Sequence, residues 1–129
     1  LKAGKIIVCD RFADSTTVYQ GFGRNLDREF IDAMHKITIG TREPDITFLL
    51  DIKPEIGLKR AQARNTVTDV FEKENFPFHR NIRQGFLQLA EQNPQRINVI
   101  PADQSVEKVN NTIMDIVINE FEKYERIIP

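Results

Sequence analysis

Three short apolar runs, each followed by polar or charged residues, constrain the fold of this chain more than any other feature. They span residues 5–10, 45–51 and 96–101, and the first of them shows no alternation of apolar with polar residues. Such runs are typical of strands that are buried on both faces, as in a parallel sheet. In parallel sheets ligands bind beyond the carboxyl ends of the strands, so the residues after each run are candidate functional positions.

Between the runs, apolar residues recur at the spacing of helices. Asp27 and Ser105 are placed to cap two of these helices. Pro54 suits the first turn of another helix, which Asp51 could cap, and Pro77 marks either the start of a helix or a kink in one. The apolar faces expected to be buried are Phe30, Ile31, Met34 and Ile37; Phe78, Ile82, Phe86, Leu89 and Ala90; and Val106, Val109, Ile113, Val117 and Phe121. Strands alternating with helices predict an α/β fold, with a parallel sheet covered by helices on both sides. The length predicts a single domain over residues 1–129.

The charge balance limits the classes of partner. Eighteen basic and nineteen acidic side chains give a net charge of −1, which argues against general binding to nucleic acid or to a membrane surface. A local basic pocket for a phosphate ligand is compatible with this balance. The one cysteine, Cys9, cannot form an internal disulfide, which favours a reducing, cytoplasmic location. His35 and His79 have no second ligand at metal-binding spacing, so no metal site is expected.

The densest group of polar residues follows the first apolar run, in residues 10–24. Arg11 could clamp phosphate oxygens there with its planar guanidinium, which a lysine cannot reproduce. If residues 14–22 are helical, the residues that share one face are Ser15, Tyr19 and Phe22, with Gln20 beside them. A hydroxyl, a phenol and an amide together form a recognition surface for a small molecule.

Each of these residues also has a structural interpretation. Asp10 and Arg11 could form an ordinary ion pair at a strand end. Asp14 or Ser15 could cap a helix in which Tyr19 serves only for packing. Gly-x-Gly spacing at residues 21–23 is a weak signal for function, because turn formation is enough to explain it.

The arrangement of these residues resembles the signature of bacterial thymidylate kinases. The matching residues are Asp10-Arg11-Phe12, Ser15, Tyr19-Gln20-Gly21 and Gly23-Arg24. The resemblance continues, in the same order, through residues 43–51, 54–64, 71–86 and 100–102. It therefore covers nearly the whole chain and implies a nucleoside-monophosphate-kinase fold that transfers phosphate from ATP to dTMP.

The resemblance implies a role for each matching residue near the acceptor. Asp10 and Arg11 would lie between the donor and acceptor phosphates, with Arg11 neutralising the charge on the phosphoryl group in transfer. The residues that would hold dTMP are Ser15 and Thr16 at the thymine edge, Tyr19 against the deoxyribose, and Gln20.

A second set would serve the donor. Arg60 and Arg64 would belong to a lid at about residues 60–77 that closes over the ATP phosphates, although they could instead form a solvated helix face. The residues expected near the adenine are Ala102, Asp103 and Gln104. Val70 stands where the lid signature has an arginine, so Arg64 would carry more of that function.

The phosphate-binding loop Gly-x-x-x-x-Gly-Lys-Ser/Thr does not occur in the sequence. The resemblance places that loop upstream, with the first strand and most contacts to Mg²⁺, so we expect the chain to be a fragment that is inactive alone. The whole protein is expected to use ATP with Mg²⁺ and to form a homodimer. Alternatives are another nucleoside or nucleoside-monophosphate kinase of the same fold, or a non-catalytic dimerisation or binding module.

Overall fold

The computed structural model describes residues 4–63 and 75–125. Its elements, in chain order, are α1 (Ala13–Thr16), the π-helix η1 (Thr17–Phe22), α2 (Arg28–Thr38), β1 (Thr47–Asp51), α3 (Pro54–Ala63), α4 (Phe76–Gln92), β2 (Ile97–Pro101) and α5 (Val106–Glu125). The second and third apolar runs therefore form strands, as predicted.

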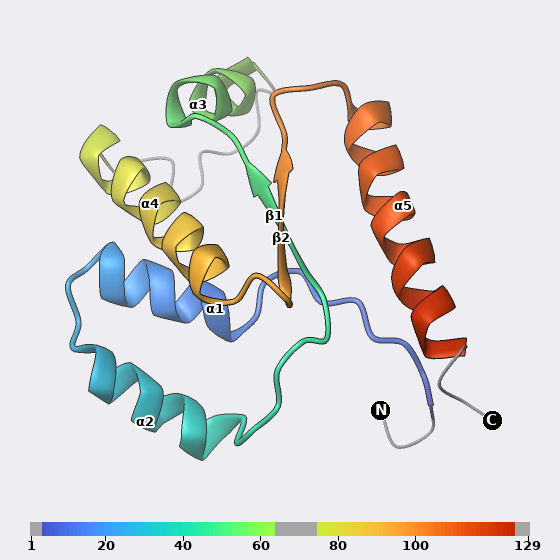
Figure 1. Ribbon diagram of the computed structural model, residues 1–129. Coiled ribbons are helices and arrows are strands. Elements are labelled where there is room, and N and C mark those ends of the chain that lie inside the picture. Colours follow the sequence, from blue (N-terminus) through green and yellow to red (C-terminus); the bar gives the residue numbers. More distant parts are fainter. Residues whose placement is uncertain (1–3, 64–74, 126–129) are drawn as a thin grey trace.

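The two strands form a parallel sheet in which Thr47 lies opposite Ile97 and Asp51 lies opposite Pro101. The connection between them runs through α3 and α4, because parallel strands need a crossover. Figure 1 shows α4 and α5 on opposite sides of the sheet. The predicted α/β class, with helices on both faces of a parallel sheet, is confirmed.

The first apolar run departs from its prediction. Residues 5–10 are not a strand, and the side chains of Ile6, Ile7 and Val8 are 73%, 61% and 94% exposed. A strand is held by ladder hydrogen bonds to a neighbour, and these residues pair with neither described strand. The apolar pattern alone could not supply that partner.

The core lies where η1 packs against α4 and the sheet. Val18 is fully buried among Phe78, Ile82 and Leu89 of α4. Close packing here depends on Gly23, since a Cβ atom at this position would lie 2.7 Å from the Phe78 ring and 2.8 Å from Ile82 Cδ1. Gly23 lies in the turn that follows η1, as its sequence context suggested, and has an ordinary φ of −77°. Close approach, and not a left-handed backbone, is therefore what requires glycine here.

The predicted helix starts agree with the structure. The Asp27 carboxylate accepts a hydrogen bond from the Phe30 amide at 3.0 Å, and the Ser105 hydroxyl accepts one from the Lys108 amide at 3.3 Å. Pro77 lies in the first turn of α4, whose cap is Asn75. Pro77 therefore marks a helix start and not a kink.

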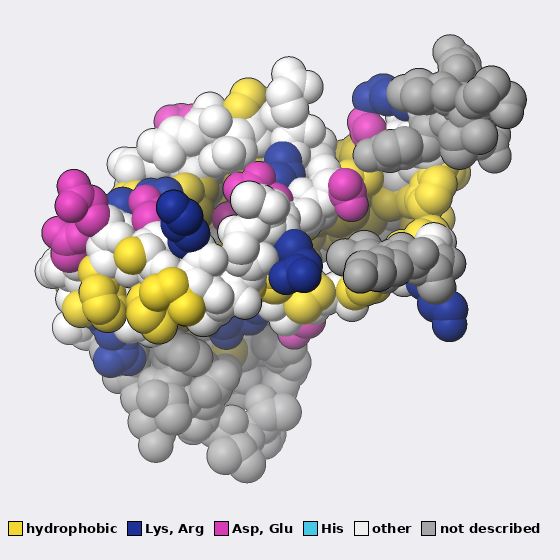
Figure 2. Space-filling model, turned by 90° about the horizontal axis from the view of Figure 1, so that it is seen from below, with side chains coloured by type: hydrophobic (Ala, Val, Ile, Leu, Met, Phe, Trp, Pro, Cys, Tyr) yellow, Lys and Arg dark blue, Asp and Glu magenta, His cyan; other side chains and the backbone are white. Residues whose placement is uncertain are grey.

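Two of the three predicted apolar faces are only partly buried. In α2 only Ile31 is buried, while Phe30, Met34 and Ile37 are 59%, 44% and 80% exposed. In α5 the middle of the face, Val109, Ile113 and Val117, is half-buried, while Val106 and Phe121 at its ends are 87% and 45% exposed. Patches of exposed apolar side chains are visible in yellow in Figure 2. The spacing predicted the helices correctly, but burial also requires an element that covers them, and no described element does so fully.

Candidate functional site

Arg11, Ser15 and Tyr19 meet at the start of the helical segment. The Arg11 guanidinium carbon lies 4.5 Å from the centre of the Tyr19 ring, in cation–π geometry. Its Nε atom donates to the Ser15 hydroxyl oxygen at 3.3 Å. The three side chains that the sequence singled out for phosphate and nucleotide binding are thus in mutual contact.

The backbone at Arg11 is strained. Its φ of +67° lies in the left-handed region, which a residue with a Cβ atom occupies at a cost of roughly 1–3 kcal/mol. The Arg11 carbonyl oxygen accepts a weak hydrogen bond from the Cys9 thiol at 3.3 Å. Strain of this kind concentrates at functional positions.

Tyr19 is held from behind by two aromatic rings of α4. Phe78 and Phe86 each lie 6.2 Å from the Tyr19 ring, centre to centre, in edge-to-face arrangements. Tyr19 lies in η1, and π-helical turns occur frequently at functional sites. The packing interpretation of Tyr19 is therefore correct, and it is compatible with a role for the face that carries Arg11.

The other predicted acceptor residues surround this contact. Asp10 and Thr16 are exposed, whereas Gln20 is partly buried and its backbone carbonyl accepts from the Leu26 amide at 2.9 Å. No helix cap is formed by the side chains of Asp14 or Ser15, because Phe12 occupies the cap position.

Asp14 instead fastens the segment to the start of β2. Its carboxylate accepts two hydrogen bonds from the Arg96 guanidinium, at 2.7 and 3.0 Å, and Arg96 also donates to the Thr47 hydroxyl at 3.1 Å. The hydrogen bond to Asp14 raises the pKa of Arg96 against the opposing effect of burial. This bidentate pair is partly buried and fixes α1 in place.

These contacts place the cluster at an unexpected end of the sheet. Arg96 and Thr47 stand where the strands begin, and Figure 1 shows α1 at that end. The sequence predicted that Asp10 and Arg11 would lie at the carboxyl ends of the strands. That prediction is wrong for this structure, because it depended on residues 5–10 forming a strand of the sheet.

The predicted donor residues do lie at the carboxyl ends. The Arg60 guanidinium of α3 donates to the Ala102 carbonyl at 2.7 Å, and the Ala102 amide donates to the Asp51 carbonyl at 2.8 Å. Gln104 donates to the Pro101 carbonyl at 3.3 Å, and Asp103 is exposed. Arg64, Val70 and most of the predicted lid fall outside the described residues.

Asp51 also forms an ion pair that the sequence did not predict. Its two carboxylate oxygens accept from the Arg83 guanidinium at 2.7 and 2.8 Å, instead of capping α3. The hydrogen bond to Asp51 raises the pKa of Arg83. Arg83 thereby ties α4 to the carboxyl end of β1, beside the Arg60 contact.

Within residues 4–63 and 75–125, no three His, Cys, Asp or Glu side chains are grouped so that they could hold a metal ion. In the same part of the chain, none of the helices has the length and apolar character needed to cross a bilayer.

Comparison with known proteins gives a consistent result. The family model for thymidylate kinase matches residues 1–113. The thymidylate kinase of Geobacter sulfurreducens is 43% identical over 124 residues, which are 92% of this chain and 58% of that protein. The thymidylate kinase of Maridesulfovibrio salexigens is 43% identical over 127 residues, covering 94% and 58% respectively.

A similarity in structure accompanies these matches. The crystal structure of thymidylate kinase from Ehrlichia chaffeensis superposes with a TM-score of 0.65 and 31% identity, over 90% of this chain and 52% of that one. The chain thus spans between about 52% and 58% of the length of these proteins.

Proposed function

The chain belongs to the thymidylate kinase family, and we propose that it carries the acceptor-binding part of an enzyme that transfers the terminal phosphate of ATP to dTMP. The activity is proposed for a chain extended to the full length of its relatives, since these residues cover 58% of the first of them. The phosphate loop that the sequence lacks would be supplied by that extension.

The observation that carries the proposal is the contact of Arg11 with Ser15 and Tyr19. Phosphoryl transfer requires little covalent help from the protein, so the protein contributes positioning and positive charge. A guanidinium held over a rigid ring, with a hydroxyl fixing its Nε atom, offers its terminal N–H groups to phosphate oxygens in a defined direction.

The proposed binding site for dTMP consists of Arg11 and the residues around its guanidinium. Arg11 binds the phosphate that receives the transferred group, and Asp10 orients it or a metal-bound water. Ser15 and Thr16 face the thymine edge. Tyr19, backed by two phenylalanine rings, packs against the deoxyribose, and Gln20 completes the nucleotide contacts.

The proposed donor site uses the opposite end of the strands. Arg60, already bound to the Ala102 carbonyl, lies where the lid leaves α3, and Asp103 and Gln104 border the adenine. Mg²⁺ would arrive on the ATP phosphates, because the described residues offer no cluster of ligands for it. Its contribution would be to neutralise charge on those phosphates.

Transfer requires the two sites to meet, and this sets a condition on the proposal. Residues 5–10 would join the sheet on the β1 side, parallel to β1, so that Asp10 and Arg11 reach its carboxyl end. The exposed side chains of Ile6, Ile7 and Val8 are suited to a strand buried on both faces.

Further parts of the proposal concern assembly and location. We infer a homodimer, supported by the apolar side chains that α2 and α5 leave exposed, which a second copy could cover. We also infer a cytoplasmic location, supported by the single exposed cysteine.

Substitution of Arg11 tests the proposed function. In a full-length enzyme that contains this chain, Arg11→Ala should lower kcat/KM for dTMP at least tenfold, equivalent to about 1.4 kcal/mol of barrier. The control is Arg80→Ala on the exposed side of α4, which should leave turnover within about twofold. An Arg11→Ala enzyme that retained more than a tenth of the wild-type value would refute the assigned role. Titration with dTMP, dUMP and dCMP separates a thymidylate kinase from other kinases of this fold.

A further inference from the structure

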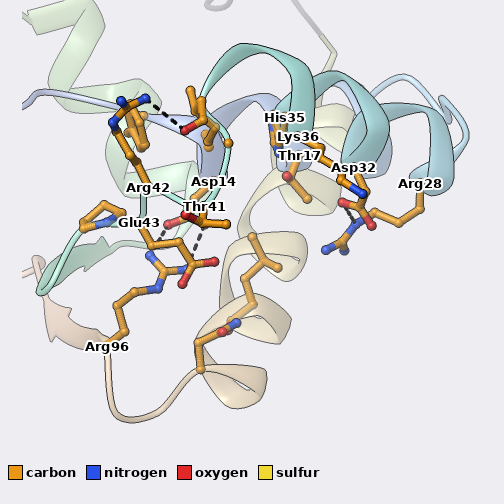
Figure 3. Close-up of a pocket in the computed structure, with 17 residues that line it drawn as sticks. Asp14, Thr17, Arg28, Asp32, His35, Lys36, Thr41, Arg42, Glu43 and Arg96 are labelled. Atoms are coloured by element: carbon orange, nitrogen blue, oxygen red, sulfur yellow. Dashed lines mark hydrogen bonds and ion pairs between the residues drawn. The ribbon is translucent and has the colours of Figure 1, made fainter.

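A pocket lies between α1, α2, α4 and the segment that leads into β1. Its volume is about 250 Å³, and Asp14, His35, Lys36, Arg42, Glu43 and Arg96 are among the residues that line it. Figure 3 shows these labelled side chains arranged around the pocket. Arg11, Ser15 and Tyr19 do not line it, so it is distinct from the proposed nucleotide site. A pocket of this size is smaller than the roughly 300–1,000 Å³ typical of drug-sized ligands.

Two buried nitrogen atoms in this pocket lack a hydrogen-bond partner. Within the described residues, the buried side-chain atoms without a partner are His35 Nε2, His79 Nε2 and Arg96 Nε, and the first and last belong to pocket-lining residues. An arginine Nε–H is always a donor, and leaving such a group unpaired costs roughly 1–3 kcal/mol or more. The unpaired Nε–H of Arg96 therefore calls for an acceptor oxygen, and the His35 Nε2 atom can donate to one when it is protonated.

The charges around the pocket favour an anion. Four cationic side chains and three acidic ones line it. Two of the acids are already neutralised, because Asp14 is paired with Arg96 and Asp32 with Arg28. Neither Lys36 nor Arg42 forms an ion pair with another described residue, although Arg42 donates to the Ile39 carbonyl at 3.4 Å. With Glu43 as the one remaining acid, two cations face a single negative charge.

We propose that this pocket binds a small oxyanion of the phosphate class. Lys36 and Arg42 supply the charge, and His35 and Arg96 supply donors from the buried side. The anion would join α2 to the loop before β1 and to the start of β2, and so would stabilise the end of the sheet at which Asp14 holds α1. The proposal is independent of the proposed kinase activity, since none of its residues is assigned to either nucleotide.

The two histidines of the chain provide an internal control for the test. Inorganic phosphate is titrated into the 129-residue chain at constant ionic strength, with chloride as the replaced anion, and both imidazoles are followed by ¹H–¹⁵N NMR. We expect saturable shifts of the His35 resonances and none for His79, which lies outside the pocket. Equal shifts of both, or no saturation by about 50 mM phosphate, would show that water satisfies these atoms and would overturn the proposal.

Substitutions locate the bound anion. Lys36→Gln and Arg42→Gln should each weaken phosphate binding about tenfold, the usual effect of losing one charged hydrogen bond. Lys108→Gln on α5 removes a cation outside the pocket and should change nothing. Arg11→Ala should also leave the His35 titration unaltered. If Arg11→Ala abolished the His35 response while the pocket variants kept it, the phosphate would be bound at the nucleotide site, and the second site would be excluded.

Discussion

The packing of η1 on α4 predicts a large effect from adding a single methyl group to Gly23. In Gly23→Ala the new Cβ atom would lie 2.6 Å from the Tyr19 carbonyl oxygen, 2.7 Å from the Phe78 ring and 2.8 Å from Ile82. All three distances are well inside van der Waals contact, and one partner is backbone. Relief therefore requires the end of η1 to move away from Phe78 and Ile82 of α4 and also to shift relative to its own Tyr19 carbonyl.

The expected magnitude follows from two opposing terms. Overpacking of this kind costs about 1–3 kcal/mol, occasionally more, while replacing glycine in an allowed conformation gains about 0.4–1 kcal/mol by restricting the unfolded chain. Because the backbone partner cannot rotate away, the steric term should lie at the upper end of its range. We expect Gly23→Ala to lower the free energy of unfolding by about 2 kcal/mol.

Gly21 supplies a matched control two residues away. A Cβ atom there would meet only Ile31 Cδ1, at 3.4 Å, so Gly21→Ala should change the free energy of unfolding by no more than about 0.5 kcal/mol, the usual range for unstrained sites. Urea unfolding followed by circular dichroism measures both variants against the wild type. If the two variants were equally stable, the close approach of η1 to α4 would be refuted.

Two further predictions follow from the structure. Arg96→Ala breaks a partly buried bidentate pair with Asp14, in which the two side chains are 15% and 24% exposed. It should lower the free energy of unfolding by about 2–3 kcal/mol, which is less than the 3–5 kcal/mol of fully buried pairs. The control is Arg28→Ala, whose pair with Asp32 is 52% and 54% exposed; it should lower the same free energy by less than about 1 kcal/mol. In hydrogen exchange, the backbone amides of Ile6, Ile7 and Val8 should be unprotected in this chain, while the amide of Leu49 in β1 should be protected. In a chain extended to the length of its relatives, all four amides should be protected. Continued free exchange at residues 6–8 of the extended chain would contradict their entry into the sheet.

Features that depend on neighbouring residues in the sequence were predictable. Asp27 and Ser105 cap helices through bonds that span three residues, and Pro77 fits a first helical turn because it needs no amide donor. The strands at residues 47–51 and 97–101 were predictable because their apolar runs have a partner to pair with.

Features that depend on distant residues were not predictable. The Asp14–Arg96 and Asp51–Arg83 pairs join residues 82 and 32 positions apart, and nothing in the local sequence links the partners. The apolar pattern of residues 5–10 predicted a strand that the structure does not have, because pairing is a property of two segments. Ser15 and Tyr19 lie four residues apart in the helical segment, as the sequence suggested, and Arg11 reaches both of them from the residues before α1.

The separation of the two proposed sites and the state of residues 5–10 have a common physical origin. Ile6, Ile7 and Val8 are largely exposed, and burying each such side chain would gain roughly 1.5–3 kcal/mol. Arg11, at φ +67°, carries strain of about 1–3 kcal/mol, which a regular strand ending at Asp10 would not require. Both costs disappear if this run enters the sheet parallel to β1. The same movement would carry Asp10 and Arg11 toward Arg60 and the phosphates of the donor. It would also separate Asp14 from Arg96, so the gain from burial must offset the roughly 2–3 kcal/mol of that pair.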